Sequence, residues 1–313
     1  MGTPLLWVGF NLFVLLSVAL DLGVFHRKPH KIRIREAALW SGVWIGLAIS
    51  FGYVVWHWYG EQRGLEYFTG YVIEKALSVD NLFVFLVLFR TFQVDEQVQH
   101  RVLAWGILGA LVMRGIMIAA GAALIARFHW ILAAFGVFLV YTGLHMFWRR
   151  GKQFHYERNP IFLFASTHLR VSKEYSGGRF FVRQDGQLFA TPLLLVLLVI
   201  EITDVTLATD SIPAIFGITR DAFIVYSSNV FAILGLRALY FLLADLLDYL
   251  RYLGFGLSLI LLFIGVKMVL EPWWHISVGL SLAVVGGILL LATIFSLWAG
   301  PRKEPGGIQP QNK

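Results

Sequence analysis

Five carboxylates lie inside long apolar stretches of this sequence. Glu74 and Asp80 fall in one stretch, and Glu201, Asp204 and Asp210 fall in another. A charge at the centre of a bilayer-spanning helix costs about 2.5–3.5 kcal/mol on insertion scales. The five acids therefore predict an aqueous cavity, a partner charge or an ion inside the protein, because contact with lipid would be too unfavourable.

Structural pairing is the simplest role for these acids. The intramembrane bases that could pair with them are Lys75, Arg114, Arg237 and Lys267. Two arginines could neutralise two acids, but pairing does not explain why the acids concentrate in two segments while the bases spread over four. We therefore favour a functional site, with part of the charge neutralised by arginine.

The chemistry of such a site is that of hard oxygen ligands, which suit Mg²⁺, Ca²⁺ and Mn²⁺. The chain has no cysteine, which excludes disulfides and thiolate metal sites. We predict Asp80, Asp204 and Asp210 as direct metal ligands, with Glu74 and Glu201 as further metal ligands or proton carriers. Side chains that would add neutral oxygen ligands or orient the carboxylates are Ser78, Asn81, Ser211, Arg114 and Arg237.

Straight helices could not point all five acids at one place. At about 100° per residue, Glu201 and Asp204 share a face of a helix, but Asp210 lies about 180° from Glu201. Pro213 disfavours helical geometry just before it and removes a backbone hydrogen bond. We therefore predict that the second acidic segment is unwound near its acids, and that the first is a candidate for the same distortion.

The composition places these segments in a membrane. The chain is 58% hydrophobic and 14% charged over 313 residues, whereas a soluble domain carries roughly a quarter charged residues. Apolar runs of about 20 residues are long enough to cross a bilayer. We expect an all-α polytopic membrane protein with one transmembrane domain, residues 1–299. Nine spans are predicted near residues 4–25, 37–58, 67–89, 101–125, 129–148, 191–216, 222–244, 252–270 and 273–298.

Basic residues give the orientation, since Lys and Arg concentrate in cytoplasmic loops. One alternating set of loops, with the tail, holds 19 of them and the other set holds 3. The N-terminus is therefore predicted outside and the C-terminus inside. The cytoplasmic loop 149–190 is predicted to carry a short amphipathic helix over 160–171 and a hairpin over 180–189. The tail 300–313 is predicted to be disordered.

A weak internal repeat relates spans 3–5 to spans 6–8. Aligning EKALSVDNLFVF with DVTLATDSIPAI matches Asp80 with Asp210 and Glu74 with Asp204. The same order brings Arg114 opposite Arg237, and the segment 143–146 (GLHM) opposite 265–268 (GVKM). Because each unit has three spans, the two copies would be inverted in the membrane, a recurring design of transporters with a midplane site.

Other classes of function find no support in the sequence. There is no G-x-S-x-G, Walker or H-E-x-x-H motif, so we do not expect an enzyme, and uphill transport would draw on an ion gradient. The net charge of +7 is explained by the loops and does not call for nucleic acid. The expected partners are the lipid bilayer and a divalent cation; protein partners stay open, and no bound cofactor is expected.

The acidic stretches also resemble a known family. TGYVIEKALSVDNLFVFLVLF, LLLVLLVIEITDVTLATDSIPAIF and NVFAILGLRALYFLLA are similar to the signature stretches of the TerC family of bacterial membrane proteins. TPLLWVGF and FFVRQDGQLFATPL resemble its Alx-like branch. The resemblance implies a multi-pass inner-membrane protein of the LysE-like transporter superfamily, linked to Mn²⁺ export and to alkaline or metal stress. It carries the family's acidic positions onto Glu74, Asp80, Glu201, Asp204 and Asp210.

The sequence thus predicts a secondary exporter of divalent cations, with Mn²⁺ as the first candidate ion and protons as a candidate coupling ion. Ca²⁺ or another divalent cation is an alternative. A different class is an accessory membrane protein that supplies metal to exported enzymes without sustained transport. Some members of the family are linked to tellurite resistance, which reads as a phenotype because a carboxylate site would repel the tellurite anion. Direction, stoichiometry and oligomeric state are left open.

Overall fold

A computed structural model describes residues 2–23, 34–128, 130–148, 172, 177–184, 187–243 and 252–300. At residues 21–23, 80, 83, 90 and 91 it describes the backbone alone. The helices are α1 (Pro4–Gly23), α2 (Ile34–Tyr59), α3 (Glu61–Thr91), α4 (Glu96–Arg127), α5 (Ile131–Trp148), α7 (Pro192–Phe216), α8 (Ala222–Leu234), α9 (Leu236–Leu243), α10 (Leu253–Leu270) and α11 (Val278–Ala299). Strands β1 (Phe181–Gln184) and β2 (Gln187–Ala190) form a small antiparallel hairpin.

Each of the nine segments predicted as a span is helical in the structure, with α8 and α9 together forming the seventh. Among the described residues, six helices are long and apolar enough to cross a membrane, or seven if the bent pair α8 and α9 counts as one span. The apolar part of α1 is shorter, and α3 is long but contains several charged residues. The all-α polytopic class is thereby confirmed.

Local chemistry explains where several helices begin. Asp95 accepts a hydrogen bond from the backbone N–H of Gln97 at the start of α4, and Asp221 does the same for Phe223 at the start of α8. Such side-chain caps satisfy N–H groups that have no partner within the helix. Thr191 precedes the first residue of α7, and Pro192 lies in its first turn, where proline is favoured because its missing N–H would have no partner within the helix.

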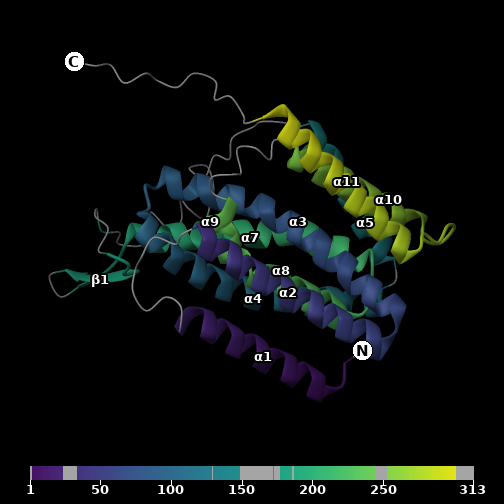
Figure 1. Ribbon diagram of the computed structural model, residues 1–313, viewed down its shortest axis with the longest axis horizontal. Helices are drawn as coiled ribbons and strands as arrows, with labels where there is room; N and C mark the ends of the chain where they lie inside the picture. The colour runs from purple at the N-terminus through teal and green to yellow at the C-terminus, as the bar shows by residue number, and fades with distance from the viewer. Residues whose placement is uncertain are drawn as a thin grey trace.

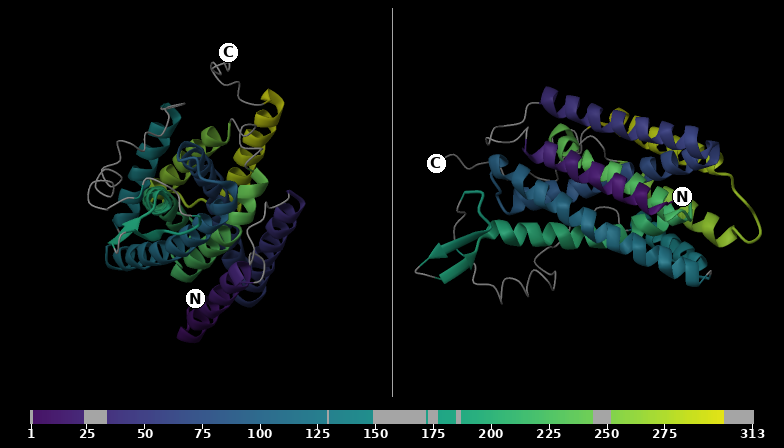
Figure 2. Two further views of the ribbon diagram at one scale, coloured as in Figure 1. Left: turned by 90° about the vertical axis from the view of Figure 1, so that its left-hand side faces the viewer. Right: turned by 90° about the horizontal axis from the view of Figure 1, so that it is seen from below.

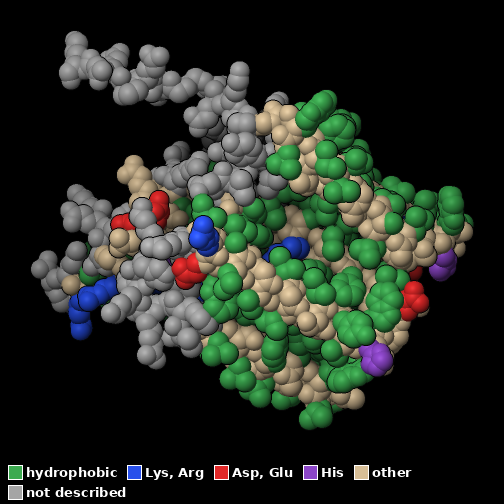
Figure 3. All heavy atoms as spheres, viewed as in Figure 1, with side chains coloured by type: hydrophobic (Ala, Val, Ile, Leu, Met, Phe, Trp, Pro, Cys, Tyr) green, Lys and Arg blue, Asp and Glu red, His purple; other side chains and the backbone are tan. Residues whose placement is uncertain are grey.

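The helices run roughly side by side in a bundle (Figure 1). Helix α1 lies along one edge, and α5, α10 and α11 lie together at the opposite edge. The hairpin of β1 and β2 projects beyond one end of the bundle (Figure 2). In the face drawn in Figure 3, most of the surface is hydrophobic or uncharged, and most charged side chains lie near the two ends. This distribution fits a bundle surrounded by lipid.

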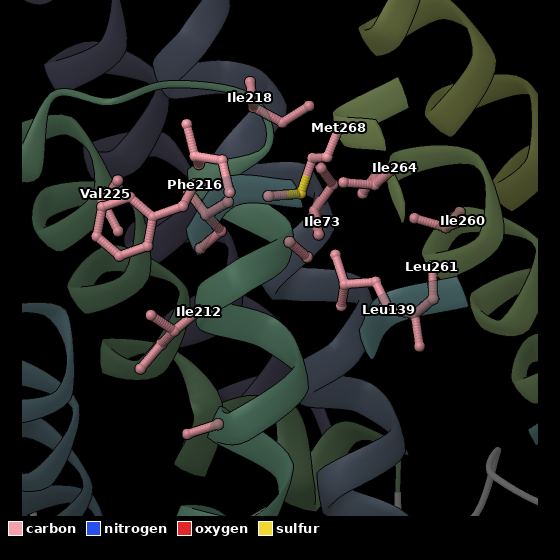
Figure 4. Close-up of a cluster of buried hydrophobic side chains, with 14 of the residues drawn as sticks. Ile73, Leu139, Ile212, Phe216, Ile218, Val225, Ile260, Leu261, Ile264 and Met268 are labelled. Atoms are coloured by element: carbon pink, nitrogen blue, oxygen red, sulfur yellow. The ribbon is translucent and has the colours of Figure 1, made fainter. Parts of the chain in front are cut away.

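A cluster of buried apolar side chains joins α3 and α7, at the centre of the bundle, to α5 and α10 at its edge. Ile73 of α3, Leu139 of α5, Phe216 of α7 and Ile264 of α10 are each 2% exposed or less and belong to it (Figure 4). Because dispersion contacts need close approach, these side chains fix the spacing of four helices. The helices that carry the predicted acids, α3 and α7, therefore lie inside the bundle.

The hairpin predicted over 180–189 is confirmed. Phe181 pairs with Ala190 and Gln184 with Gln187, which leaves two residues for the turn. The turn residues 185 and 186, the helix predicted over 160–171 and the tail from 301 lie outside the described residues.

The predicted unwinding of the acidic segments was wrong. Helix α7 is continuous from Pro192 to Phe216, and α3 is continuous through both of its predicted ligands. Pro213 lies in the last turn of α7, where the loss of one backbone hydrogen bond does not interrupt the rest of the helix. The irregularity occurs instead at Gly235, where α8 and α9 meet at an angle of 43°.

Candidate functional site

Arg114 lies at the centre of the buried charge. It extends from α4 and is 1% exposed. Its Nε donates to Oδ2 of Asp204 on α7 at 3.0 Å, and its Nη2 donates to Oδ1 at 2.9 Å. Two parallel N–H···O bonds between a guanidinium and a carboxylate are the strongest form of this pairing and fix both side chains.

The same guanidinium also reaches α3. Nη1 of Arg114 forms a close ion pair with Oε1 of Glu74, whose side chain is fully buried. The other Glu74 carboxylate oxygen has no hydrogen-bond partner among the described residues. One arginine therefore faces two carboxylates on two different helices, which leaves the group of three with a formal charge of −1. Three helices, α3, α4 and α7, converge on this charge cluster.

Buried hydroxyl groups continue the polar surface on α3 and α7. Ser78 lies one turn after Glu74 and is fully buried, and Ser211 on α7 is 2% exposed. Neither hydroxyl has a hydrogen-bond partner among the described residues. Buried polar groups in proteins usually have partners, so these oxygens are available to a ligand or to water. Asn81 is also buried, at 3% exposure.

Glu201 is half-buried and lies against α4. Its carboxylate fills the space where Gly109 has no side chain. Glu201 and Asp204 are three residues apart and therefore share the face of α7 that is turned toward α4. Sequence reasoning missed the role of Gly109, which opens the room for this carboxylate.

Asp210 faces a different neighbour. It is half-buried, and the side chain of Thr142 on α5 hydrogen-bonds to its carboxylate. Six residues along a straight helix rotate a side chain by about 120° relative to Asp204 and advance it by about 9 Å. The straight α7 thus directs Asp204 toward α4 and Asp210 toward α5.

The remaining predicted site residues are placed as follows. Asp80 lies in the helical backbone of α3, and the position of its side chain is outside the described structure. Arg237 lies in α9, just after the bend, and is 3% exposed. Among the described side chains, no group of three or more His, Asp or Glu converges as a metal site would. A cation at Glu74 or Asp204 would have to displace Arg114 from at least one of them.

Among the described side chains, neither of the two lysines within the predicted spans, the half-buried Lys75 and the buried Lys267, pairs with this cluster. Lys267 donates to the hydroxyl of Ser281 at 3.0 Å, and Lys75 donates to the carbonyl of Ala232 at 3.1 Å. Among the described side chains, Arg114 is paired with two of the predicted acids, Glu74 and Asp204.

One further buried acid, Glu66, falls between the predicted spans 37–58 and 67–89. Glu66 lies in the first turns of α3, is 4% exposed and accepts hydrogen bonds from Thr219 at 2.6 Å and from Arg63 at 2.8 Å. It lines a cavity of about 690 Å³ at this end of the bundle. Other charged or ionisable side chains around the cavity are Glu61, Lys267, Glu271 and His275.

Comparison with known proteins identifies the family. The integral membrane protein TerC family matches residues 59–304. An uncharacterized membrane protein of Myxococcus xanthus, STKORF319, is 47% identical over 296 residues, covering 95% of this chain and 93% of its own length. A protein of Escherichia coli K12 named "Putative membrane-bound redox modulator Alx" is 45% identical over 318 residues, covering 98% of this chain and 99% of its own length.

A further protein with the Alx name, from Salmonella typhi, is 44% identical over 97% of both chains. No solved structure matches this chain. The segment matched by the family begins at the last residue of α2, so α1 and nearly all of α2 lie before it. Every predicted site residue lies within the matched segment. The chain is a multi-pass membrane protein and belongs to the TerC family of integral membrane proteins.

Proposed function

We propose that this protein is a secondary transporter that exports divalent cations, with Mn²⁺ as its ion, across the bacterial inner membrane. The observation that carries the proposal is Arg114 held between Glu74 and Asp204, fully buried among three helices. Buried ion pairs are weak contributors to stability, because desolvation offsets most of the attraction. Ionisable groups at such depth are rare outside ion pathways and proton relays.

The excess of acid over base gives the site its selectivity for cations. Glu201 and Asp210 flank the cluster on α7, and the described side chains show no base paired with either. Carboxylate and hydroxyl oxygens are the ligands that Mn²⁺, Mg²⁺ and Ca²⁺ prefer. We propose that the straight helices represent a closed state in which Arg114 holds two carboxylates, and that an incoming cation takes over one of them.

An inverted repeat would supply the two alternating states. Two close backbone contacts join α5 to α10: a Cβ on Gly136 would lie 2.9 Å from the Gly265 carbonyl oxygen, and one on Gly143 would lie 3.0 Å from the Ser258 carbonyl oxygen. The repeat matches Gly143 with Gly265 and, at the same spacing, Gly136 with Ser258. If each residue is replaced by its counterpart in the other unit, the contact of Gly136 with Gly265 becomes the contact of Ser258 with Gly143. The contacts run forward along α5 and backward along α10, so the two helices are antiparallel.

The pairing of the other helices supports the same relation. Helix α3 packs along α8, and its counterpart α7 packs along α4. In each unit, the first helix therefore packs against the second helix of the other unit. With nine spans and the N-terminus outside, the cavity at Glu66 would open to the outer face and could receive the exported ion.

Two alternatives are kept. The same carboxylates would suit Ca²⁺ or another divalent cation. An accessory role, in which the protein supplies metal to exported enzymes without sustained transport, is compatible with the site as well. The Escherichia coli relative is named for redox modulation; because this chain has no cysteine, we propose that any redox effect here follows from metal supply.

The test is Mn²⁺ flux in proteoliposomes that contain only this protein, beside an Asp80→Asn, Asp210→Asn double variant. Flux that the double variant abolishes is expected and would establish a self-sufficient transporter. No flux from well-folded protein, with several divalent ions and both directions of the pH gradient, would overturn transport in favour of the accessory role.

A further inference from the structure

The bend between α8 and α9 exposes the carbonyl end of a helix inside the bundle. Helix α8 ends at Leu234, and α9 starts at Leu236 in a new direction. The last carbonyl groups of a helix carry a partial negative charge and lack partners within the helix. Ala232 is fully buried and Leu234 is 3% exposed, so the surrounding protein limits the access of water to this end.

The ammonium group of Lys75 lies at this carbonyl end. Nζ of Lys75, on α3, donates to the carbonyl oxygen of Ala232 at 3.1 Å. Lys75 follows Glu74 directly, but successive side chains on a helix point about 100° apart. Glu74 therefore faces Arg114 while Lys75 faces the bend. Among the described side chains, Lys75 forms no ion pair with a carboxylate.

Gly235, the residue at the bend, has no side chain and therefore leaves room for the lysine ammonium. A Cβ on Gly235 would lie 3.2 Å from Nζ of Lys75 and 3.0 Å from Cβ of Trp44 on α2. Trp44 is itself 5% exposed. The backbone at the bend, the side chain of Trp44 and the end of the half-buried Lys75 side chain thus lie close together.

We infer that the bend is a monovalent-cation site and that Lys75 fills it as a tethered cation. Backbone carbonyls and the C-terminal ends of broken helices coordinate Na⁺ and K⁺ in membrane proteins. An ammonium of similar charge satisfies the same oxygens. Removing the lysine side chain leaves the carbonyl oxygen of Ala232 open to a small cation such as K⁺ or ammonium.

The tethered cation also positions the transport machinery, an extension that rests on the proposed function. Arg237 lies two residues after Gly235, on the first turn of α9. The direction of α9, and with it the place of Arg237, is set at the bend that Lys75 holds. Lys75 is therefore a positioning residue for transport and contacts no transported ion itself.

The binding part is tested on the purified full chain, without transport. Thermal unfolding of Lys75→Ala in detergent is compared in equal concentrations of choline, sodium, potassium and ammonium chloride. Lys75→Ala is expected to unfold at lower temperature than the wild type in choline and to recover saturably with at least one small cation. The wild type and Lys75→Arg, which keeps a cation, are expected to respond to all four salts alike.

Two results would overturn the inference. One is a Lys75→Ala protein whose unfolding temperature is the same in choline as in every small cation. The other is a protein that cannot be recovered folded in any of the four salts, by size-exclusion chromatography, with Lys75→Ser behaving the same way.

Transport gives the second readout. Mn²⁺ flux through Lys75→Ala is expected to fall about tenfold or more in choline, the ratio that one charged hydrogen bond contributes, and to return with the cation that restores stability. Absence of flux in the wild type would contradict the proposed function and leave the unfolding result standing. Flux that stays low while the cation restores stability would contradict the positioning role alone.

Discussion

Arg114 and Asp204 are 90 residues apart in the chain, and two parallel hydrogen bonds of 3.0 and 2.9 Å join them inside the bundle. The same guanidinium pairs with Glu74. Because a carboxylate without this partner would be left buried and charged, the arginine of α4 balances the acids that α3 and α7 bring into the bundle. The contacts of this one side chain thus connect the stability of the bundle with its chemistry.

Replacing Arg114 should be strongly destabilising. Arg114→Met leaves two buried carboxylates without a counter-charge, and breaking a buried pair in this way costs about 3–5 kcal/mol. Thermal unfolding in detergent measures the effect. Adding Glu74→Gln and Asp204→Asn to the variant should recover part of the loss.

The matched control is Arg220→Met. Arg220 also pairs with a glutamate, Glu271, at 2.8 Å, but the two side chains are 55% and 39% exposed. Exposed pairs contribute at most about 1 kcal/mol. Equal effects of the two arginine variants would contradict the assignment of Arg114 to a buried charge cluster.

The α5–α10 contact predicts an asymmetry among glycines. A Cβ on Gly265 would lie 2.7 Å from the Gly136 carbonyl oxygen, so Gly265→Ala should force the helices apart and destabilise the protein by about 1–3 kcal/mol. Gly286 on α11 meets nothing within 4 Å, and Gly286→Ala should be neutral or slightly stabilising. Thermal unfolding that ranks them in the opposite order would contradict the close approach of the two helices.

Thr142 is predicted to tune the cation site through Asp210. Thr142→Val keeps the shape of the side chain but removes the hydrogen bond to the carboxylate. We expect the KM for Mn²⁺ flux to change by about three- to tenfold, which is the change in affinity that the loss of one hydrogen bond produces. Thr142→Ser, which keeps the hydroxyl group, should behave nearly as the wild type. An unchanged KM in the valine variant would show that this contact has no part in binding.

Transport should rise with pH. Metal binding requires the ionised form of the carboxylates, so protons compete with the cation at low pH. Mn²⁺ flux measured without a pH gradient is expected to increase between about pH 6 and pH 9. A flat rate over this range would count against proton competition and against protons as the coupling ion.

The orientation is testable because the chain has no native cysteine. Single cysteines at Leu188 in β2 and at Trp274 after α10, which are 64% and 70% exposed, should react with a membrane-impermeant maleimide from opposite sides. With nine spans, Trp274→Cys is labelled in intact cells and Leu188→Cys only after the membrane is opened. Labelling of both from outside would contradict the proposed topology.

Much of this fold could be predicted from the sequence, because lipid requires long apolar helices and polar breaks mark their ends. The positions of all nine helical segments and of the hairpin followed from such local signals. The bend at Gly235 did not. Its neighbours Trp44 and Lys75 come from two other helices, and neither is near Gly235 in the sequence.

The candidate site could be predicted in its residue types but not in its arrangement. Local rules favoured a break at Pro213, yet a proline in the last turn leaves α7 straight. Straightness then separates Asp210 from Asp204, since a helix turns side chains by a fixed angle per residue. That Arg114 would bridge Glu74 and Asp204 depends on how three helices meet, which no pattern within one of them reveals.

The most direct test of the account is Mn²⁺ flux in proteoliposomes through Asp204→Asn, with Glu96→Gln as a control for loss of an acid. Asp204 is 5% exposed and bound to Arg114, whereas Glu96 lies in the exposed first turn of α4. If the charge cluster lies in the ion path, Asp204→Asn is expected to abolish flux in protein that remains folded, and Glu96→Gln to leave it unchanged. Wild-type flux through folded Asp204→Asn would contradict the claim that these carboxylates carry the ion.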